Sequence, residues 1–281
     1  MEQLPRLQAR ISSLQQLRDL VRALRALAAS HVQEAQGALV GIRRYVEVVE
    51  DAIAEGAAMF PETDGLAASS QPFAASVLIV VCSEHGFVGA FNERLLDRAE
   101  AERKEGQELV VIGGRGAILA EERGLDVGWR YPMATHVGGV LGVTRQVAER
   151  LAATSTADAV FGSYRRGGNF ETEARSVLPL DPALLVGSER RSPPLHHLAP
   201  DALLQRLAGE YLFAEITRAV MESLASENGA RLRVMENADH NIGDKLEALR
   251  RSENALRQEA ITSELLDVIT GSEAILGGFG R

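Results

Sequence analysis

Cysteine, lysine, aromatic residues and long apolar runs are all scarce in this chain of 281 residues. The single cysteine, Cys82, excludes an internal disulfide and a cysteine-rich zinc site. Aromatic residues make up 5% of the sequence, which is low for a barrel or sandwich core and suits packed helices. No uncharged apolar run approaches the ~20 residues that span a bilayer. Charges also interrupt the N-terminal segment, so we expect neither a membrane span nor a secretory signal.

Positive charge is also in deficit. The chain has 30 lysines and arginines against 39 aspartates and glutamates, so its net charge is −9. Such a chain lacks a general electrostatic attraction for nucleic acid, so we expect no nucleic-acid partner. The first 45 residues are nevertheless basic, with arginines at positions 6, 10, 18, 22 and 25. A basic end of this kind can meet an acidic protein partner.

Proline is rare at both ends of the chain, and glycine is rare at the N-terminal end. The first 55 residues contain one proline, Pro5, and apolar residues recur there at alternating spacings of three and four. This pattern predicts a coiled-coil helix over residues 1–58. The successive three-residue steps through Leu14 and Leu17 predict a stutter that locally unwinds the supercoil.

The C-terminal region has the same character. No proline follows Pro200, and apolar residues again recur at helical spacing. These residues form a seam along one side of the helix, and Glu253 occupies one of its positions. We therefore expect a second coiled-coil helix over residues 200–276, ending near 271 or shortly after Ile275, and a flexible tail over 277–281. Neither terminal helix has another long helix to pair with, which favours an antiparallel coiled coil of the two.

The middle of the sequence has a different period. Four apolar runs of strand length lie at 77–83, 109–113, 157–163 and 174–180, and helical stretches lie between them at about 92–105, 115–123 and 140–153. Buried strands that alternate with helices indicate a mostly parallel sheet covered on both faces. We expect a Rossmann-like, three-layer α/β domain over residues 73–192, inserted between the terminal helices, with proline-rich connectors at 61–72 and 179–200.

Two glycine-containing turns could carry chemistry, and each has a simpler interpretation. The run Gly113-Gly-Arg-Gly116 follows a strand and opens a helix, where phosphate can bind, but Ile118 breaks the dinucleotide fingerprint and tight packing explains the glycines better. The segment from Ser83 to Asn92 collects a serine, a glutamate and a histidine, but neighbours at one strand end cannot usually face each other. We favour a sharp turn there, with Asn92 as the N-cap of the next helix.

The histidines at positions 31, 136, 196, 197 and 240 show no metal-ligand spacing. From the residues alone we therefore expect no catalytic residue, no metal site and no cofactor.

Four segments, in order along the chain, carry a family resemblance. They are Ala28-Ala-Ser30, Ser83-Glu-His-Gly-Phe-Val-Gly-Ala-Phe-Asn92, Ser226-Glu-Asn-Gly-Ala-Arg231 and Leu256-Arg-Gln-Glu-Ala-Ile-Thr-Ser-Glu264. Together they resemble the gamma subunits of F-type ATP synthases, over nearly the whole chain. The last segment is the most specific of the four.

The resemblance implies a mechanical function. It implies that the chain is a non-catalytic central rotor, whose coiled coil enters the hexamer of alpha and beta subunits while its α/β domain lies near the epsilon subunit and the membrane c-ring. Rotation of an asymmetric shaft shifts the beta subunits between conformations through differential contact. The expected location is peripheral, at the cytoplasmic face of a bacterial inner membrane.

The resemblance also assigns residues to three contact regions. Arg257 and Gln258 would hydrogen-bond the catch loop of a beta subunit, and Thr262 and Glu264 would be polar residues of the same contact. The apolar shaft in the sleeve of the head would comprise Ile261, Leu265, Leu266, Val268, Ile269 and Ile275. Leu24 and Arg25 would face the lower part of the beta subunits, and Arg43, Arg44, Tyr45, His196 and His197 would lie at the base near epsilon and the ring.

The sequence departs from the family pattern mainly in that base and in the turn before Asn92, where the usual cysteine and one glycine are missing. We interpret this as a divergent branch of the family. Two other hypotheses remain open at this point. One is a stand-alone α/β nucleotide-binding module with a coiled-coil dimerisation arm, and the weaker one is a coiled-coil adaptor, which would leave Arg257 and Gln258 without a role.

Overall fold

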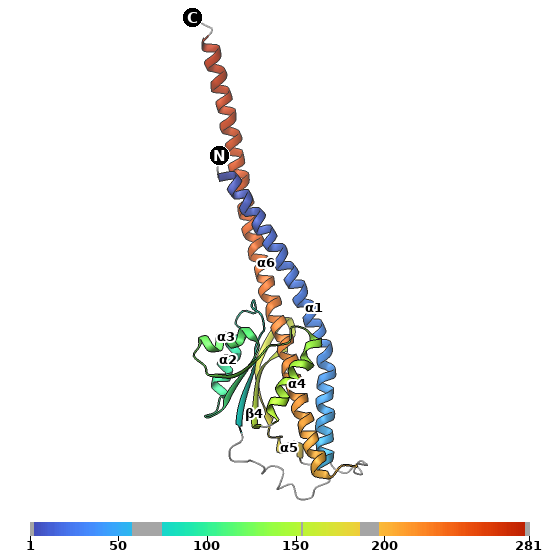
Figure 1. Ribbon diagram of the computed structural model, residues 1–281. Coiled ribbons are helices and arrows are strands. Elements are labelled where there is room, and N and C mark those ends of the chain that lie inside the picture. Colours follow the sequence, from blue (N-terminus) through green and yellow to red (C-terminus); the bar gives the residue numbers. More distant parts are fainter. Residues whose placement is uncertain (1–2, 58–74, 153, 186–196, 279–281) are drawn as a thin grey trace. The chain divides into compact units, whose positions relative to one another are not determined.

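A computed structural model describes residues 3–57, 75–152, 154–185 and 197–278 (Figure 1). The chain divides into two compact units. The first, here called the helical unit, contains Met1–Ala26 and Met235–Arg281, and the second, the sheet unit, contains Leu27–Val234. Two long helices, α1 (Gln3–Ala57) and α6 (Pro200–Gly278), each contribute to both units. No helix in the described ranges is long and apolar enough to cross a membrane.

The sheet unit is built on five strands in the order β3-β2-β1-β4-β5. They are β1 (Ala75–Val81), β2 (Glu108–Ile112), β3 (Val127–Tyr131), β4 (Thr154–Arg165) and β5 (Asn169–Leu178). The first four are parallel, and β5 pairs antiparallel with β4 through a hairpin that sets Arg165 opposite Asn169. The predicted mixed α/β class and mostly parallel sheet are confirmed, whereas β3 was not predicted.

Helices cover both faces of this sheet because β1 and β2 are apolar on both sides. Along β1, Leu78 and Val80 face one way, where they pack with α2 (Phe91–Glu102) and α3 (Gly114–Glu122). Alternate residues Val77 and Ile79 face the other way and pack with α4 (Val140–Leu151), α6 and α1. Strands that are buried on both faces read as continuous apolar runs, as the sequence showed.

Short elements complete the connections in the sheet unit. These are the 3-10 turns η2 (Val137–Gly139) and η3 (Arg166–Gly168) and the four-residue helix α5 (Pro182–Leu185). The whole predicted connector at 61–72, residues 186–196 of the predicted connector at 179–200, and residues 279–281 of the predicted tail lie outside the described residues.

Helix α6 packs directly on the sheet through small and polar residues. Ser223 donates to the carbonyl of Val81 at 2.6 Å, and Ser226 donates to the carbonyl of Gly162 at 2.8 Å. One turn later, a Cβ added to Gly229 would lie 3.1 Å from the Cα of Gly168. Gly229 therefore permits a close approach of two backbones, and it does not end the helix.

The apolar seam of α1 differs from the predicted one. Leu17 is 46% exposed, and the buried and half-buried positions near it are Ile11, Leu14, Arg18 and Val21. These positions, and those that follow up to Ile53, keep an unbroken alternation of three and four residues. The predicted stutter is therefore wrong, and it arose because arginines at 18 and 25 occupy seam positions where an apolar residue was sought.

Two local predictions concern the end of α6 and the N-cap of α2. Helix α6 continues to Gly278, past the first predicted end near residue 271 and in agreement with the second, shortly after Ile275. Asn92 is not the N-cap of α2, because the helix begins at Phe91 after Ala90 and its cap makes no side-chain hydrogen bond. The amide of Asn92 is used within the preceding turn instead, as described below.

Candidate functional site

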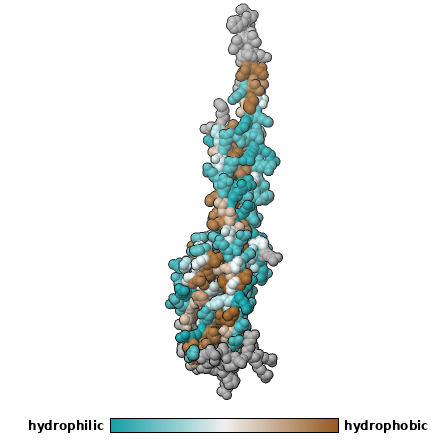
Figure 2. All heavy atoms as spheres, turned by 90° about the vertical axis from the view of Figure 1, so that its right-hand side faces the viewer, coloured by the Kyte–Doolittle hydropathy of each residue, from teal (hydrophilic) through white to brown (hydrophobic). Residues whose placement is uncertain are grey.

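The C-terminal end of α6 is an exposed apolar surface in the helical unit. Gln8 of α1 hydrogen-bonds Glu253 at 3.0 Å, and α1 begins only five residues before Gln8. Beyond about residue 258, α6 therefore extends past the described start of α1. The apolar side chains of this part are half exposed or more: Ile261 51%, Leu265 58%, Leu266 56%, Val268 70% and Ile269 53%. Figure 2 shows hydrophobic surface at this end of the helix.

The polar residues expected at the same end lie on successive turns of α6. Arg257 pairs with Glu253 one turn earlier, at 2.9 Å, and Thr262 donates to the backbone carbonyl of Gln258 at 2.8 Å. Gln258 and Glu264 are exposed, as are Arg257 and Thr262. The structure thus places all four on one exposed helical segment together with the apolar side chains. The side chain of Ile275 lies outside the described part.

Leu24 and Arg25 lie on α1 in the helical unit and are both partly exposed. Arg25 approaches Asp239 of α6, with its Nη1 atom 3.8 Å from Oδ2. Arg18 and Arg22 reach the same carboxylate, at 2.7 and 3.1 Å. Their hydrogen bonds hold the pKa of Asp239 below its ordinary value, with the bond from Arg18 contributing most. Sequence reasoning missed Asp239, although its position between Met235 and Ile242 on the α6 seam could have revealed it.

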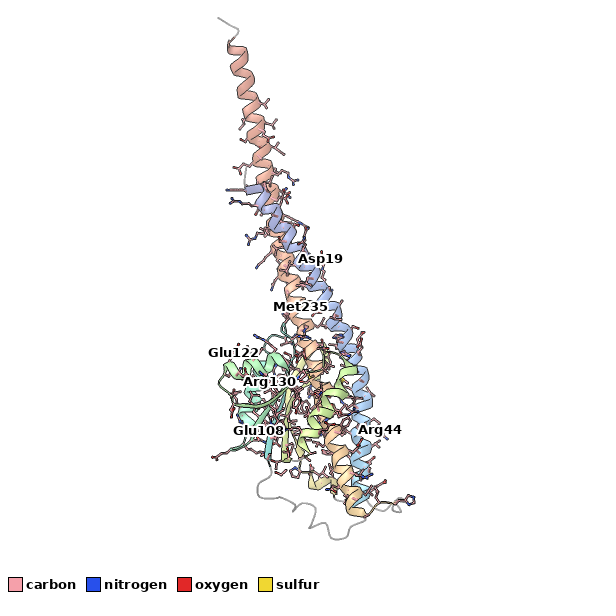
Figure 3. The ribbon with its side chains drawn as sticks, viewed as in Figure 1. Asp19, Arg44, Glu108, Glu122, Arg130 and Met235 are labelled. Carbon is pink, nitrogen blue, oxygen red and sulfur yellow. The ribbon has the colours of Figure 1, made fainter. Side chains whose placement is uncertain are left out.

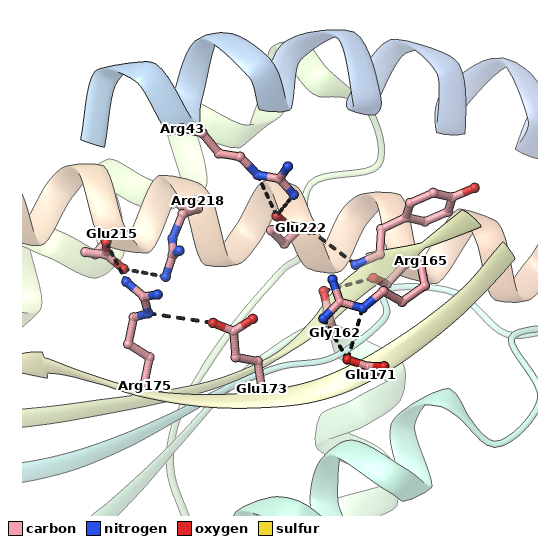
Figure 4. Close-up of polar contacts among 11 residues, drawn as sticks. Arg43, Gly162, Arg165, Glu171, Glu173, Arg175, Glu215, Arg218 and Glu222 are labelled. Atoms are coloured by element: carbon pink, nitrogen blue, oxygen red, sulfur yellow. Dashed lines mark hydrogen bonds and ion pairs between the residues drawn. The ribbon is translucent and has the colours of Figure 1, made fainter. Parts of the chain in front are cut away.

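The described residues among those expected at the base make separate contacts. Arg43 bonds Glu222 of α6, with Nη2 2.5 Å from Oε1 (Figure 4). Tyr45 donates to Glu210 of the same helix. Arg44, labelled on α1 in Figure 3, pairs with Glu47 at 2.8 Å and has a side chain that is 71% exposed. His197 is exposed, and His196 lies outside the described residues.

Buried carboxylates of α6 support this region from inside the sheet unit. Glu222 also accepts from the backbone amide of Tyr164 at 3.2 Å. Glu215, which is 1% exposed, pairs with Arg218 at 2.9 Å and with Arg175 of β5 at 3.4 Å (Figure 4). Buried charges of this kind are retained only when they are paired. The network therefore holds α6 on the sheet. The spacing of its residues in the sequence gave no sign that they would pair.

The glycine-rich start of α3 is occupied by the chain's own carboxylate. Glu84 accepts hydrogen bonds from the amides of Gly114 at 2.9 Å and Met133 at 2.7 Å. A helix N-terminus of this kind attracts anions, and here the anion is a glutamate side chain. A Cβ added to Gly116 would lie 2.0 Å from the Cβ of Cys82. The simpler interpretation of these glycines, tight packing between strand and helix, is confirmed.

The turn after β1 is held by hydrogen bonds that leave no catalytic arrangement among its described residues. Asn92 accepts from the amide of Ser83 at 2.9 Å and donates to the hydroxyl of Ser83 at 2.8 Å. That hydroxyl donates to the carbonyl of His85 at 2.9 Å. Burial raises the pKa of the Cys82 thiol to about 12. Ser83 therefore stabilises the turn. Among the described residues of the chain, no group of three potential metal ligands occurs.

Arg231 of α6 clamps this turn. It pairs with Glu227 at 2.5 Å and donates to the carbonyls of Gly86 at 3.3 Å and His85 at 3.5 Å. Glu227 is 3% exposed, and burial raises its pKa to about 7 despite the opposing effect of Arg231. The segment Ser226–Arg231, quoted above for its resemblance, thus joins α6 to the turn that carried the other motif.

Comparisons with known proteins agree with this geometry. The family model described as ATP synthase matches residues 3–275. The chain is 28% identical to the ATP synthase gamma chain of Moorella thermoacetica, covering 96% of this chain and 98% of that protein, and 29% identical to the gamma chain of Fuscovulum blasticum, covering 98% and 100%.

Solved structures show the same fold. A chain of the Euglena gracilis mitochondrial ATP synthase, from a structure of its OSCP, F1 and c-ring parts, matches with a TM-score of 0.67 at 14% identity, covering 99% of this chain and 96% of that chain. A chain of the central stalk and c-ring of the Tetrahymena thermophila enzyme matches with a TM-score of 0.54 at 15% identity, covering 78% and 99%. This chain belongs to the ATP synthase family, and within that family to the gamma chains.

Proposed function

We propose that the chain is the central rotor shaft of an F-type ATP synthase and transmits torque between a membrane c-ring and the catalytic head of alpha and beta subunits. It is a non-catalytic subunit, and its partners are the alpha and beta subunits, epsilon and the c-ring. The observation that carries the proposal is the exposed apolar end of α6, which extends past the start of α1. A helix end of this kind needs a partner that covers it.

In this proposal the apolar segment of α6 turns inside the head. Ile261, Leu265 and Val268 are more than half exposed, and Ile275 lies further along the same helix. Apolar contact is non-directional, so it can hold a shaft without fixing its angle. Leu266 and Ile269 would share this surface.

Directional contacts then supply the angular coupling. Arg257 offers a planar set of donors for carboxylates, and Gln258 adds a neutral donor and acceptor. With Thr262 and Glu264, they would contact the catch loop of a beta subunit. Leu24 and Arg25 would face the lower part of the beta subunits, and Arg43, Arg44, Tyr45, His196 and His197 would lie near epsilon and the ring.

We propose in addition how the terminal helices pair and which type of α/β domain the sheet forms. The seams of α1 and α6 support an antiparallel coiled coil formed by residues 1–58 and 200–276. The order β3-β2-β1-β4-β5 with four parallel strands supports a Rossmann-like, three-layer domain over 73–192. We place the chain as a peripheral subunit on the cytoplasmic face of a bacterial membrane.

Reconstitution of the chain with its alpha and beta subunits tests the function. The variant Arg257→Ala with Gln258→Ala is expected to lower assembly or turnover about tenfold, because paired side chains at an interface centre are lost. Arg98→Ala is the matched control, since Arg98 makes a similar pair within one helix, with Glu102 at 2.7 Å, far from the proposed contact in sequence. The proposal fails if no hexamer assembles and the chain instead forms a stable, nucleotide-binding homodimer.

A further inference from the structure

Three arginines of α1 converge on one carboxylate of α6 within the helical unit. The Nε atoms of Arg18 and Arg22 lie 2.7 and 3.1 Å from Oδ1 of Asp239, and Arg25 approaches Oδ2 at 3.8 Å. The Asp239 side chain is 15% exposed, whereas the arginine side chains are between 31% and 49% exposed. The carboxylate thus lies between the helices, and the arginines surround it from one helix.

These charges interrupt an otherwise apolar seam. On α6 the buried positions Met235, Ile242 and Leu246 follow heptad spacing, and Asp239 occupies the seam position between the first two. On α1, Arg18 and Arg25 occupy the equivalent positions on either side of Val21. A polar group at a seam position costs stability relative to an apolar one, and its best-attested use is to fix register.

We propose that Asp239 and the three arginines are a register lock, which restricts α1 and α6 to one axial alignment in the helical unit. A seam of leucine, isoleucine and valine repeats every seven residues, so apolar contact alone tolerates a shift by one heptad. The lock supplies the energy difference between the aligned and the shifted pairing.

The sequence shows why a shifted pairing loses these contacts. A shift by one heptad retains one arginine opposite Asp239 and replaces the other two with uncharged residues. In one direction these are Ala29 and Val32, and in the other Ile11 and Gln15. The carboxylate would then have fewer donors in either direction and would lie against aliphatic side chains in the first, which is unfavourable.

The second polar seam position cannot exclude one of these two shifts. Glu253 lies two heptads after Asp239 and accepts a hydrogen bond from Gln8. The shift that brings Ala29 and Val32 to Asp239 would replace Gln8 with Gln15, which carries the same amide. Glu253 is therefore satisfied in that alignment too, so within the helical unit the exclusion of this alignment rests on Asp239.

Glycine at position 243 makes room for the lock. A Cβ added to Gly243, one turn after Asp239, would lie 3.1 Å from Nη2 of Arg18. The guanidinium of Arg18 thus lies against the backbone of α6 while its Nε bonds the carboxylate. Position 243 is a costly place for glycine in a helix, and this contact gives a reason for it.

Disulfide cross-linking of the full chain measures the register directly. In a Cys82→Ser background, the pair Gln8→Cys with Glu253→Cys reports the observed alignment. The pair Gln15→Cys with Glu253→Cys reports the one-heptad shift that brings Ala29 and Val32 to Asp239. We expect the first pair to cross-link in the otherwise unchanged chain and the second to cross-link weakly. Neither pair changes Asp239 or its arginines.

The decisive variant replaces Arg18, Arg25 and Asp239 with leucine, which leaves an apolar seam that can still pair. It is expected to raise cross-linking of the shifted pair at least about fivefold. Asp239→Leu alone should act in the same direction. Glu247→Leu is the matched control, because it removes a pair with Arg251 that lies within α6 alone, and it should leave both yields unchanged.

The inference is overturned if the triple leucine variant cross-links only in the observed alignment, as the unchanged chain does. It is also overturned if Glu247→Leu raises the shifted yield as much as Asp239→Leu does. Neither readout requires assembly or ATP turnover, so the register lock and the rotor function can fail independently.

Discussion

The Cys82 side chain fills the space beside Gly116 that any other residue at position 116 would need, since an added Cβ would lie 2.0 Å from the Cβ of Cys82 and 2.6 Å from its Sγ. Gly116 lies in the first turn of α3, and Cys82 follows β1. The contact allows α3 to pack closely against the sheet. The glycine-rich turn is therefore explained by packing and not by a bound phosphate.

This contact predicts the sign of two glycine substitutions. Gly116→Ala should lower the free energy of unfolding by about 1–3 kcal/mol, because the added methyl group overpacks the site. Gly142→Ala in α4 should raise it by about 0.5–1 kcal/mol, because nothing lies within 4 Å of the added atom and alanine favours a helix. Denaturant unfolding of both variants measures the difference. A neutral Gly116→Ala would contradict the packing account.

The buried Glu227 predicts a pH dependence of stability. Burial raises the pKa of its carboxyl from 4.5 to about 7, Arg231 opposes this rise, and the charge of Glu84 adds to it. Between these pH values the folded chain holds a proton that the unfolded chain has released. The contribution of Glu227 to the free energy of unfolding should therefore fall as pH rises from about 4.5 to about 7.

Glu227→Gln tests this sign, because an amide does not titrate. The variant should reduce the fall in unfolding free energy over that pH range by about 1–3 kcal/mol, measured by denaturant unfolding at a series of pH values. Glu236→Gln is the control, since Glu236 is exposed on the same helix. An unchanged slope in Glu227→Gln would show that the carboxyl is ionised throughout the range.

The exposed end of α6 predicts the behaviour of the isolated chain. Leu265→Glu with Val268→Glu should reduce self-association and the binding of an apolar dye, because these two side chains are 58% and 70% exposed. Sedimentation velocity across a range of concentrations measures the association. Leu141→Glu, at an exposed leucine of α4, should have little effect. If it acts as strongly as the double variant, the α6 end is not the associating surface.

Much of the fold could be predicted because its signals are local. The strands at 77–83, 109–113 and 157–163 were visible as apolar runs, and proline-free periodic segments marked the long helices. Strand β3 was missed because Val127-Gly-Trp-Arg-Tyr131 is short and its residues alternate between exposed and half-buried. Its assignment depends on pairing with β2, which is not local information.

The candidate contact residues differ in the same way. Arg257 and the apolar residues after it could be named as candidates because their motif is contiguous, and the structure shows that they are exposed. The pairing of Asp239 with the arginines of α1 could not be predicted, because a seam defined by apolar residues passes over an arginine such as Arg18. Their pairing depends on which residues face each other across two helices about 220 positions apart in sequence.

The most direct test of the rotor function is rotation of a probe attached to this chain in the assembled complex. Cys82 is fully buried and unsuitable for labelling, so the probe belongs on Glu105→Cys in a Cys82→Ser background, at an exposed turn after α2. With the alpha and beta subunits fixed to a surface and ATP supplied, the account predicts continuous rotation in one direction. A complex that hydrolyses ATP while the probe stays at a fixed angle would contradict it.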